Sequence, residues 1–301
     1  MHIHWYPGHM AKAQRMIRGQ LDLIDVVIEL VDARIPLSSA NPVIAELIET
    51  KPRVVALNKS DLAEPARTAE WLNYFRNRGL TAVTLDAASG KGTKELTGRV
   101  EQEANEKIAK LVAKGIKARA VRAMILGIPN VGKSSLINRL LGTATAKTGD
   151  RPGVTRGQQW IKVGKNLELL DTPGVLWPKM DDQEVAFKLA VTGAIKDDIF
   201  DMEKVILKLL GVLRESYSDR LVERYKLTQQ LPEDTVELLA AIGAKRGCLR
   251  SGGVIDYEKA GRIVLTDFRT GKLGQFTLDR PEQMVTSEAN PVPTNDNMSL
   301  V

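Results

Sequence analysis

An apolar run at 123–126 leads directly into Gly127-Ile128-Pro129-Asn130-Val131-Gly132-Lys133-Ser134, and a segment with helical spacing follows at 134–141. The octapeptide fits the pattern Gly-x-x-x-x-Gly-Lys-Ser. The glycines let backbone amides wrap a phosphate chain, the lysine reaches its terminal phosphates, and the serine ligates Mg²⁺. The positive N-terminus of the following helix faces the same anion. The sequence therefore predicts a phosphate-binding P-loop that contacts a nucleotide through Asn130, Val131, Gly132, Lys133, Ser134 and Ser135.

The tetrapeptide Asn58-Lys59-Ser60-Asp61 follows a second apolar run at 54–57. The Asp61 carboxylate can accept hydrogen bonds from the N1–H and the exocyclic amine of guanine. Adenine lacks this donor pair and would leave the carboxylate unpaired. We expect Asn58 to bind the base edge and the aliphatic part of Lys59 to cover the base face. Alone the tetrapeptide is typical of a turn, but beside a P-loop it predicts guanine selectivity.

Two further motifs follow the P-loop in the order expected of a nucleotide switch. Asp171-Thr172-Pro173-Gly174 ends a predicted strand, where Asp171 can hold a magnesium-bound water and the Gly174 amide can sense the γ-phosphate. Thr155, in Pro152-Gly153-Val154-Thr155, can offer its hydroxyl and carbonyl to magnesium and the γ-phosphate. The predicted Mg²⁺ ligands are therefore Ser134, Thr155 and Asp171.

A weaker signal stands at Asp86-Ala87-Ala88-Ser89, after an apolar run at 82–85. A backbone amide near Ala87 is placed to contact the guanine oxygen. GTPases usually have Ser where Asp86 stands, so the sequence leaves this base contact open.

Short apolar runs alternate with helical segments up to about residue 178. This pattern predicts an α/β GTPase domain over 1–178, with a mostly parallel sheet, helices on both faces and a basic helical segment at 1–22. Ligands bind at the carboxyl ends of such strands, where each motif stands. A smaller, mainly helical domain is predicted over 179–284, with helices at 184–193, 203–216, 219–227 and 234–244. The polar segment 285–301 is predicted to be disordered.

The motif order is circularly permuted. In most GTPases the P-loop comes first, whereas here the guanine motif at 58–61 precedes it. Permutation moves the chain ends without moving the strands. The segment after Gly174 then runs directly into the helical domain, so the nucleotide state can reposition that domain.

The sequence closely resembles the ribosome biogenesis GTPase A family (YlqF/RbgA), the circularly permuted GTPases of large ribosomal subunit assembly. The resemblance spans residues 5 to about 283. Besides the motif order, it rests on Trp5-Tyr6-Pro7-Gly8-His9-Met10-Ala11-Lys12, Asp32-Ala33-Arg34-Ile35-Pro36 and Lys245-Arg246-Gly247-Cys248. It implies a GTPase that binds the precursor of the large subunit and contacts ribosomal RNA through its helical domain.

The expected catalytic groups are Lys133, Thr155, Gly174 and His9. Val175 stands where many GTPases place a Gln that orients the attacking water, so we expect slow hydrolysis alone and stimulation by the ribosomal particle. His9 can position that water, and a structural or RNA-contacting role is the alternative. Asn130 occupies a place where some GTPases recruit K⁺.

Composition sets broader limits. Lys and Arg outnumber Asp and Glu by 43 to 37, and the single cysteine, Cys248, excludes an intrachain disulfide. With no long apolar run and no signal-peptide pattern, we expect a cytoplasmic protein, monomeric when free. Basic residues outnumber acidic ones between 245 and 280, which favours RNA contact. The alternatives are a GTPase of RNA modification, a nucleotide-regulated RNA-binding protein with little turnover, and a P-loop kinase, against which the guanine motif argues.

Overall fold

The structure of the chain is a computed structural model that describes residues 7–48, 51–117, 119–142, 159–172, 174 and 182–281. Its centre is one six-stranded sheet in the order β3-β2-β1-β4-β6-β5. The strands are β1 (Val26–Asp32), β2 (Arg53–Asn58), β3 (Thr81–Thr84), β4 (Val121–Gly127), β5 (Gln159–Val163) and β6 (Leu167–Asp171). All neighbouring pairs are parallel except β5 and β6. The predicted mostly parallel sheet is confirmed.

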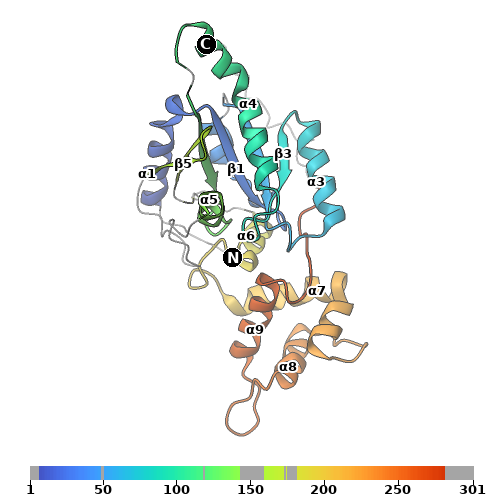
Figure 1. Cartoon of the computed structure of the whole chain (residues 1–301). Coiled ribbons are helices and arrows are strands. Elements are labelled where there is room, and N and C mark those ends of the chain that lie inside the picture. Colours follow the sequence, from blue (N-terminus) through green and yellow to red (C-terminus); the bar gives the residue numbers. More distant parts are fainter. Residues whose placement is uncertain are drawn as a thin grey trace, which may run out of the picture.

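Helices cover both faces of the sheet (Figure 1). On one face α4 (Thr93–Ala113) and α5 (Lys133–Leu141) bury strand residues of one apolar cluster. On the other face α1 (Pro7–Arg18) and α2 (Pro42–Leu47) cover β1, β4 and β6, and α3 (Pro65–Asn77) covers β2 and β3. A short 3-10 helix, Leu21–Leu23, joins α1 to β1. The central β1 is buried along its whole length because both of its faces are covered.

The remainder of the described chain is helical, as predicted, and lies at the lower end of the molecule in Figure 1. Its helices are α6 (Gln183–Thr192), α7 (Met202–Tyr225), α8 (Thr235–Lys245) and α9 (Tyr257–Arg269). The helix α9 was not predicted. The predicted break between 216 and 219 is confirmed by a kink at Tyr217, whose φ of −144° and ψ of 33° are not helical and separate two helical stretches of α7. The division into domains at 178 and 284 stays a prediction.

After α9 the chain returns to the sheet through residues 275–281, which we call the return segment. The Leu278 amide donates to the carbonyl of Arg34 at 2.8 Å. The buried Asp279 carboxylate accepts from the Ser38 amide at 2.7 Å and pairs with Lys188 of α6 at 2.8 Å. Trp71 of α3 donates its indole N–H to the Asp279 carbonyl at 3.3 Å. The helical region is therefore attached to the sheet at both of its ends.

A buried ion pair at the carboxyl end of β1 joins the same parts. Arg34 donates to both carboxylate oxygens of Asp32, at 2.9 and 2.7 Å, and is only 1% exposed. Burial by itself would raise the pKa of Asp32, but Arg34 and Lys59 outweigh it and hold that pKa below its usual range. Arg34 also reaches the carbonyl of Thr192 in α6 at 3.4 Å, and its guanidinium lies 5.9 Å from the ring of Phe268 in α9.

Loss of this pair should weaken the whole fold. We expect Arg34→Met to lower the free energy of unfolding by about 3 kcal/mol, because it leaves the buried Asp32 charge with Lys59 alone. Adding Asp32→Asn should restore part of the loss. Urea unfolding followed by tryptophan fluorescence measures both variants. The control is Arg67→Met, which breaks a more exposed pair with Glu70 and should change stability by less than about 1 kcal/mol. Equal losses for Arg34→Met and the control would contradict this role.

Candidate nucleotide site

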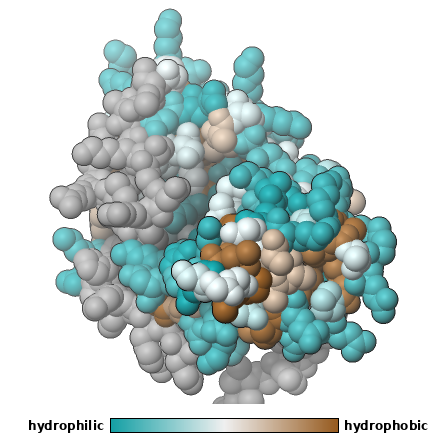
Figure 2. Space-filling view, turned by 90° about the horizontal axis from the view of Figure 1, so that it is seen from below, coloured by the Kyte–Doolittle hydropathy of each residue, from teal (hydrophilic) through white to brown (hydrophobic). Residues whose placement is uncertain are grey.

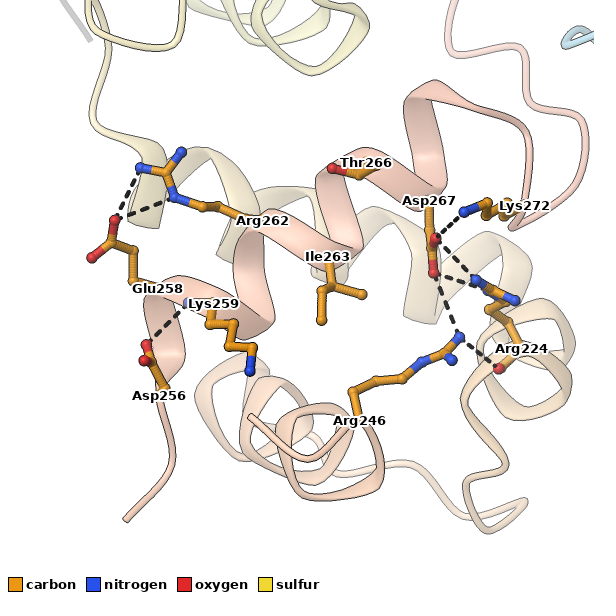
Figure 3. Close-up of a pocket in the computed structure, with 10 residues that line it drawn as sticks. All are labelled: Arg224, Arg246, Asp256, Glu258, Lys259, Arg262, Ile263, Thr266, Asp267 and Lys272. Carbon is orange, nitrogen blue, oxygen red and sulfur yellow. Dashed lines mark hydrogen bonds and ion pairs between the residues drawn. The ribbon is translucent and has the colours of Figure 1, made fainter. Parts of the chain in front are cut away.

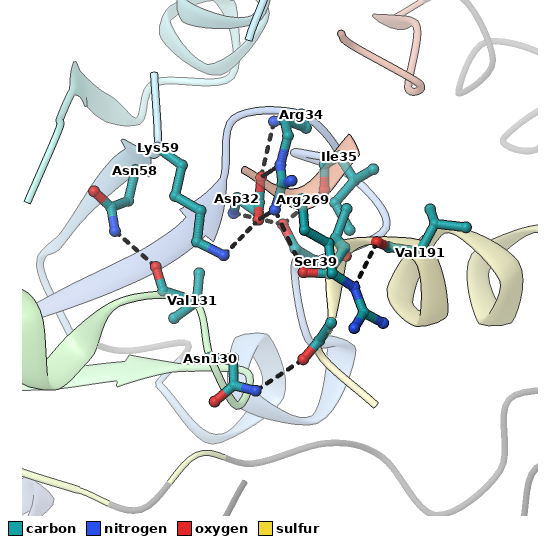
Figure 4. A network of polar contacts seen from close by, with 12 residues as sticks. Asp32, Arg34, Ile35, Ser39, Asn58, Lys59, Asn130, Val131, Val191 and Arg269 are labelled. Carbon is teal, nitrogen blue, oxygen red and sulfur yellow. Dashed lines mark hydrogen bonds and ion pairs between the residues drawn. The ribbon is translucent and has the colours of Figure 1, made fainter. Parts of the chain in front are cut away.

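The predicted nucleotide motifs meet at the carboxyl edge of the sheet. The strand order reverses between β1 and β4, and such a reversal opens the crevice in which doubly wound sheets bind ligands. In this crevice β1 ends at Asp32, β2 at Asn58 and β4 at Gly127. Figure 4 shows Lys59, which follows β2, directed toward Asp32 at the end of β1, and Asn58 directed toward Val131 of the P-loop. The guanine motif and the P-loop lie side by side at this edge, and a single site formed by all the motifs stays a prediction.

The P-loop has the backbone conformation that its glycines allow. Gly132 has φ of 107°, and a Cβ atom there would lie 2.2 Å from Nδ2 of Asn58. The buried Lys133 curls back over the loop and donates to the carbonyls of Gly127 at 3.0 Å and Ile128 at 2.9 Å. Lys133 is also the first residue of α5, so its ammonium group and the N-terminus of that helix both contribute positive charge at the P-loop. This arrangement suits a phosphate chain.

Asn58 joins the P-loop to the turn that contains Ala87. Its Nδ2 donates to the carbonyl of Val131 at 2.7 Å, and its Oδ1 accepts from the Ala87 amide at 2.9 Å. The side chain is buried. Sequence reasoning placed Asn58 on the base edge, but here its amide holds two loops together. A guanine contact at Ala87 stays a prediction, since its N–H is used by Asn58 in this structure.

Asp86 shapes its own turn, which accounts for an acidic residue in a place where Ser is usual. One carboxylate oxygen accepts from the amides of Ala88 at 2.9 Å and Ser89 at 3.1 Å, and the other accepts from the Ser89 hydroxyl. Burial would raise the pKa of Asp86, but these hydrogen bonds outweigh it and lower the pKa. Asp86, in place of the usual Ser, therefore caps its own turn.

Asp61 lies on the exposed side of the turn that follows β2. Partial burial and the nearby Asp86 charge raise the pKa of Asp61. Two hydrogen-bond donors would favour its ionised form, and the edge of guanine provides them. The carboxylate is thus suited to a ligand that donates, as the sequence predicted.

Lys59 is anchored toward the protein interior. It has the left-handed backbone conformation, with φ of 59°, and its Nζ lies 3.1 Å from Oδ2 of Asp32. Burial lowers the pKa of Lys59, and Asp32 opposes that shift. The guanine motif is therefore connected to the ion pair that joins β1 to the helical region. A contact between the Lys59 stem and a base stays a prediction.

The C-terminal end of α6 lies against the P-loop. Asn130 donates from Nδ2 to the carbonyl of Gly193 at 2.8 Å, as Figure 4 shows. Arg269 of α9 donates to the carbonyls of Ala190 at 2.8 Å and Val191 at 3.1 Å. Donors at a helix C-terminus satisfy carbonyls that the helix leaves open. The P-loop and α9 thus cap the same helix end.

Gly174, the predicted γ-phosphate sensor, lies against the P-loop. A Cβ atom on it would lie 2.8 Å from Cα of Pro129 and 3.1 Å from Nζ of Lys133. Nearby, the Thr172 hydroxyl donates to the carbonyl of Ile125 at 2.5 Å and ties β6 to β4. Ser134 and Ser135 are partly buried in the first turn of α5. Thr155 and Val175 lie outside the described residues, as do the side chains of His9 and Asp171.

A groove of about 710 Å³ lies in the helical region, between α7, α8 and α9 (Figure 3). Its lining is mainly charged and comprises Arg224, Arg246, Asp256, Glu258, Lys259, Arg262, Ile263, Thr266, Asp267 and Lys272. Asp267 pairs with Arg224 at 2.9 Å, Arg246 at 3.6 Å and Lys272 at 4.0 Å. One buried carboxylate therefore gathers three cations along the groove.

The basic excess between 245 and 280 is therefore only partly available to a partner. Arg269 pairs with Asp197 at 2.7 Å and caps α6, so its role is structural. Arg250 pairs with Asp256 at 3.3 Å. The sequence establishes only the net excess and not which charges are paired, because the partners lie on other turns and helices.

Asp32-Ala33-Arg34 was expected only as part of the family resemblance, with no predicted role in the site. The signal was present, since a charged pair directly follows a strand whose residues are otherwise mostly apolar. Burial of two opposite charges at a strand end indicates that each is the partner of the other.

Known proteins resemble this chain in sequence and in structure. A family model described as 50S ribosome-binding GTPase matches residues 122–235. Ribosome biogenesis GTPase A of Bacillus cereus is 56% identical over 283 residues, covering 94% of this chain and 95% of that protein. Mitochondrial ribosome-associated GTPase 1 of Mus musculus is 35% identical, covering 92% and 90%. The crystal structure of GNP-bound YlqF from T. maritima has a TM-score of 0.63 at 26% identity, covering 90% of this chain and 99% of that one.

The matched family model begins at the P-loop strand and does not reach the guanine motif at 58–61, which lies earlier in this chain. The full-length relatives, in contrast, match across both halves. Among the described helices, none is long and apolar enough to cross a membrane. The high identity over nearly the whole chain confirms the resemblance: the chain belongs to the ribosome biogenesis GTPase A family, with the motifs of its GTPase domain in permuted order.

Proposed function

We propose that this chain binds GTP, hydrolyses it to GDP and phosphate, and acts as a switch in late assembly of the large ribosomal subunit. The observation that carries the proposal is the Asn58 bridge, which places the guanine motif and the P-loop in one crevice. A base held by Asp61 and a phosphate chain held at Lys133 then belong to the same nucleotide. The names of the relatives, ribosome biogenesis GTPase A and mitochondrial ribosome-associated GTPase 1, support the ribosomal role.

The donor set of the proposed magnesium site fits the ion. Ser134, Thr155 and Asp171 would hold Mg²⁺ through oxygen atoms, directly or through water, and Mg²⁺ prefers such ligands together with substrate phosphates. When bound, the ion would neutralise charge on the phosphates. Ser134 stands in the first turn of α5, directly after Lys133, which is the position that this role requires.

The assignment of Asp61 to guanine predicts how a substitution there changes nucleotide preference. Asp61→Asn should move preference from GTP toward xanthosine triphosphate by about tenfold or more, because xanthine offers an acceptor where guanine has its amine. Competition binding with both nucleotides measures the change. In the wild type, GTP affinity should rise with pH through the raised pKa of Asp61, since only the carboxylate accepts both hydrogen bonds. An unchanged preference in the variant would remove Asp61 from the base site.

Hydrolysis is expected to be slow in the free protein. Val175 cannot orient water, so another group must do so, and we propose His9 for this role. Asn130 uses its Nδ2 on Gly193, and its amide oxygen is the atom that would face a K⁺ ion near the phosphates. A fixed cation there would stabilise charge that develops during phosphoryl transfer.

Turnover on purified large-subunit precursor particles tests both groups. We expect particles to stimulate the wild type, and K⁺ to support turnover about tenfold better than Na⁺. Asn130→Ala should lose the difference between the two salts. His9→Ala should lower turnover on the order of a hundredfold while nucleotide affinity stays unchanged. Equal rates in both salts would contradict the K⁺ proposal, and a fully active His9→Ala would contradict the histidine.

The groove of the helical region is the proposed contact with ribosomal RNA. Lys259 and Arg262 are exposed on α9, and Arg262 pairs with Glu258 at 2.9 Å. Figure 2 shows hydrophilic side chains around a group of apolar ones at this end of the molecule. On α1, Lys12, Arg15 and Arg18 are exposed as well. We propose that GTP presents both basic surfaces together and that hydrolysis releases the protein.

Co-sedimentation with precursor particles tests the switch. We expect tighter binding with a nonhydrolysable GTP analogue than with GDP, and binding that weakens steeply as salt rises. Reversing the charges of Lys259 and Arg262 to Glu should weaken binding and lower the salt slope by about one per lost phosphate contact. The matched control reverses Arg99 and Lys110, two exposed charges on α4, and should bind normally. Equal particle affinity in the GTP and GDP states would refute the switch and leave a GTPase.

A further inference from the structure

The turn that reads guanine continues into residues 61–64, and the return segment lies along them. Gln275 donates from Nε2 to the carbonyl of Asp61 at 3.0 Å. The Phe276 amide donates to the carbonyl of Leu62 at 2.9 Å. The Glu64 amide then donates to the Thr277 hydroxyl at 3.1 Å. Three consecutive residues of the return segment therefore hold the backbone immediately after the base-reading position.

Glu64 is held from two directions. Its Oε2 accepts from the Thr277 amide at 3.2 Å and from the Tyr217 hydroxyl of α7 at 2.9 Å. Arg220, one turn further along α7, lies 3.8 Å from the other carboxylate oxygen. Glu64 precedes α3, but its side chain does not cap that helix. Its carboxylate is instead used to attach the guanine turn to the helical region.

The kink in α7 lies at the residue that contacts both Glu64 and the return segment. Tyr217 is the residue at which α7 departs from helical dihedral angles, and its ring packs edge-on against Phe276 with the ring centres 4.8 Å apart. Burial and the Glu64 carboxylate raise the pKa of Tyr217, so its hydroxyl stays protonated and donates. The turn after α9 adds close packing, because a Cβ atom on Gly271 would lie 2.6 Å from the Leu62 side chain.

We propose that Tyr217, Gln275 and Thr277 are positioning residues for guanine specificity, which act by fixing the turn that presents Asp61. This rests on the proposed function, in which Asp61 reads the base. For the Asp61 carboxylate to accept two hydrogen bonds from guanine, the backbone that carries it must be fixed before binding. The contacts of Tyr217, Gln275 and Thr277 fix this backbone from the side of the helical region. By linkage, a bound guanine base must in turn stabilise the docking of the return segment.

Binding of GDP and of inosine diphosphate separates specificity from general affinity. Inosine keeps N1–H but lacks the exocyclic amine, so it makes only one of the two hydrogen bonds to Asp61. We expect Thr277→Val and Gln275→Ala to lower the preference for GDP over inosine diphosphate about tenfold, since hydrogen bonds to a charged group contribute factors of this size or more. Thr277→Ser keeps the hydroxyl and should retain the wild-type preference.

Two controls distinguish positioning from general damage. Thr270→Val removes a hydroxyl that bonds only within α9, and Gln230→Ala removes an exposed amide from the loop before α8; both should keep the wild-type preference. A variant that weakens both nucleotides by the same factor has a structural effect alone and contradicts the proposal. So does an unchanged preference. Wild-type protein that binds neither nucleotide would instead contradict the proposed function.

Hydrogen exchange of the unmodified protein tests the reverse direction without any variant. The amides of Phe276 and Leu278 donate across the contact between the return segment and the sheet. We expect saturating GDP to slow their exchange by about tenfold more than saturating inosine diphosphate does. Linkage requires this factor to equal the loss of GDP preference expected for Thr277→Val and Gln275→Ala. Equal protection by both nucleotides, or none by either, would overturn the coupling.

Discussion

The buried pairing of Asp32 with Arg34 is the constraint on which the rest of the molecule depends. The pair stands at the end of the central strand, where both faces of the sheet are already covered and neither charge can reach water. Each charge must therefore be paired inside the protein. Asp32 also receives Lys59 from the guanine motif, and Arg34 reaches Thr192 and Phe268 of the helical region. One electrostatic requirement thus fixes the nucleotide turn and the helical region against the same strand end.

Circular permutation brings both ends of the helical region to the edge of the sheet where the motifs stand. After Gly174 the chain continues into α6, whose far end is capped from the P-loop by Asn130. The other end of the helical region, the return segment, lies on residues 61–64. The P-loop and the guanine motif are therefore each connected to the helical region by a separate contact. In a GTPase with unpermuted order, the chain beyond that glycine would continue into further strands of the sheet instead.

The sequence predicted those features whose causes are local. Strand ends, the P-loop and the guanine motif follow from short apolar runs and from residues that stand side by side in the chain. What it missed depends on partners far away. Asn58 is turned inward by Val131 and Ala87, and Arg269 is neutralised by Asp197 of an earlier segment. The helix α9 is an exception, because its buried residues Ala260, Val264, Leu265 and Phe268 recur at helical spacing and Asp256 caps its first turn, so the local pattern was sufficient to predict it.

The same long-range pairing limits what net charge can say about a partner. Counted along the chain, the segment from 245 to 280 is clearly basic, but Asp267 alone pairs with two of its cations, Arg246 and Lys272, and with Arg224 of α7. A phosphate that approached these cations would have to compete with a buried carboxylate already in place, and that competition reduces the gain from counterion release. Lys259 and Arg262 stand on an exposed helix face, where Arg262 pairs with Glu258 at 2.9 Å, so a phosphate would compete there with an exposed carboxylate and not with a buried one. The exposed cations of α9 are therefore more accessible to an anionic partner, while the arginines paired with Asp267 hold the groove in shape.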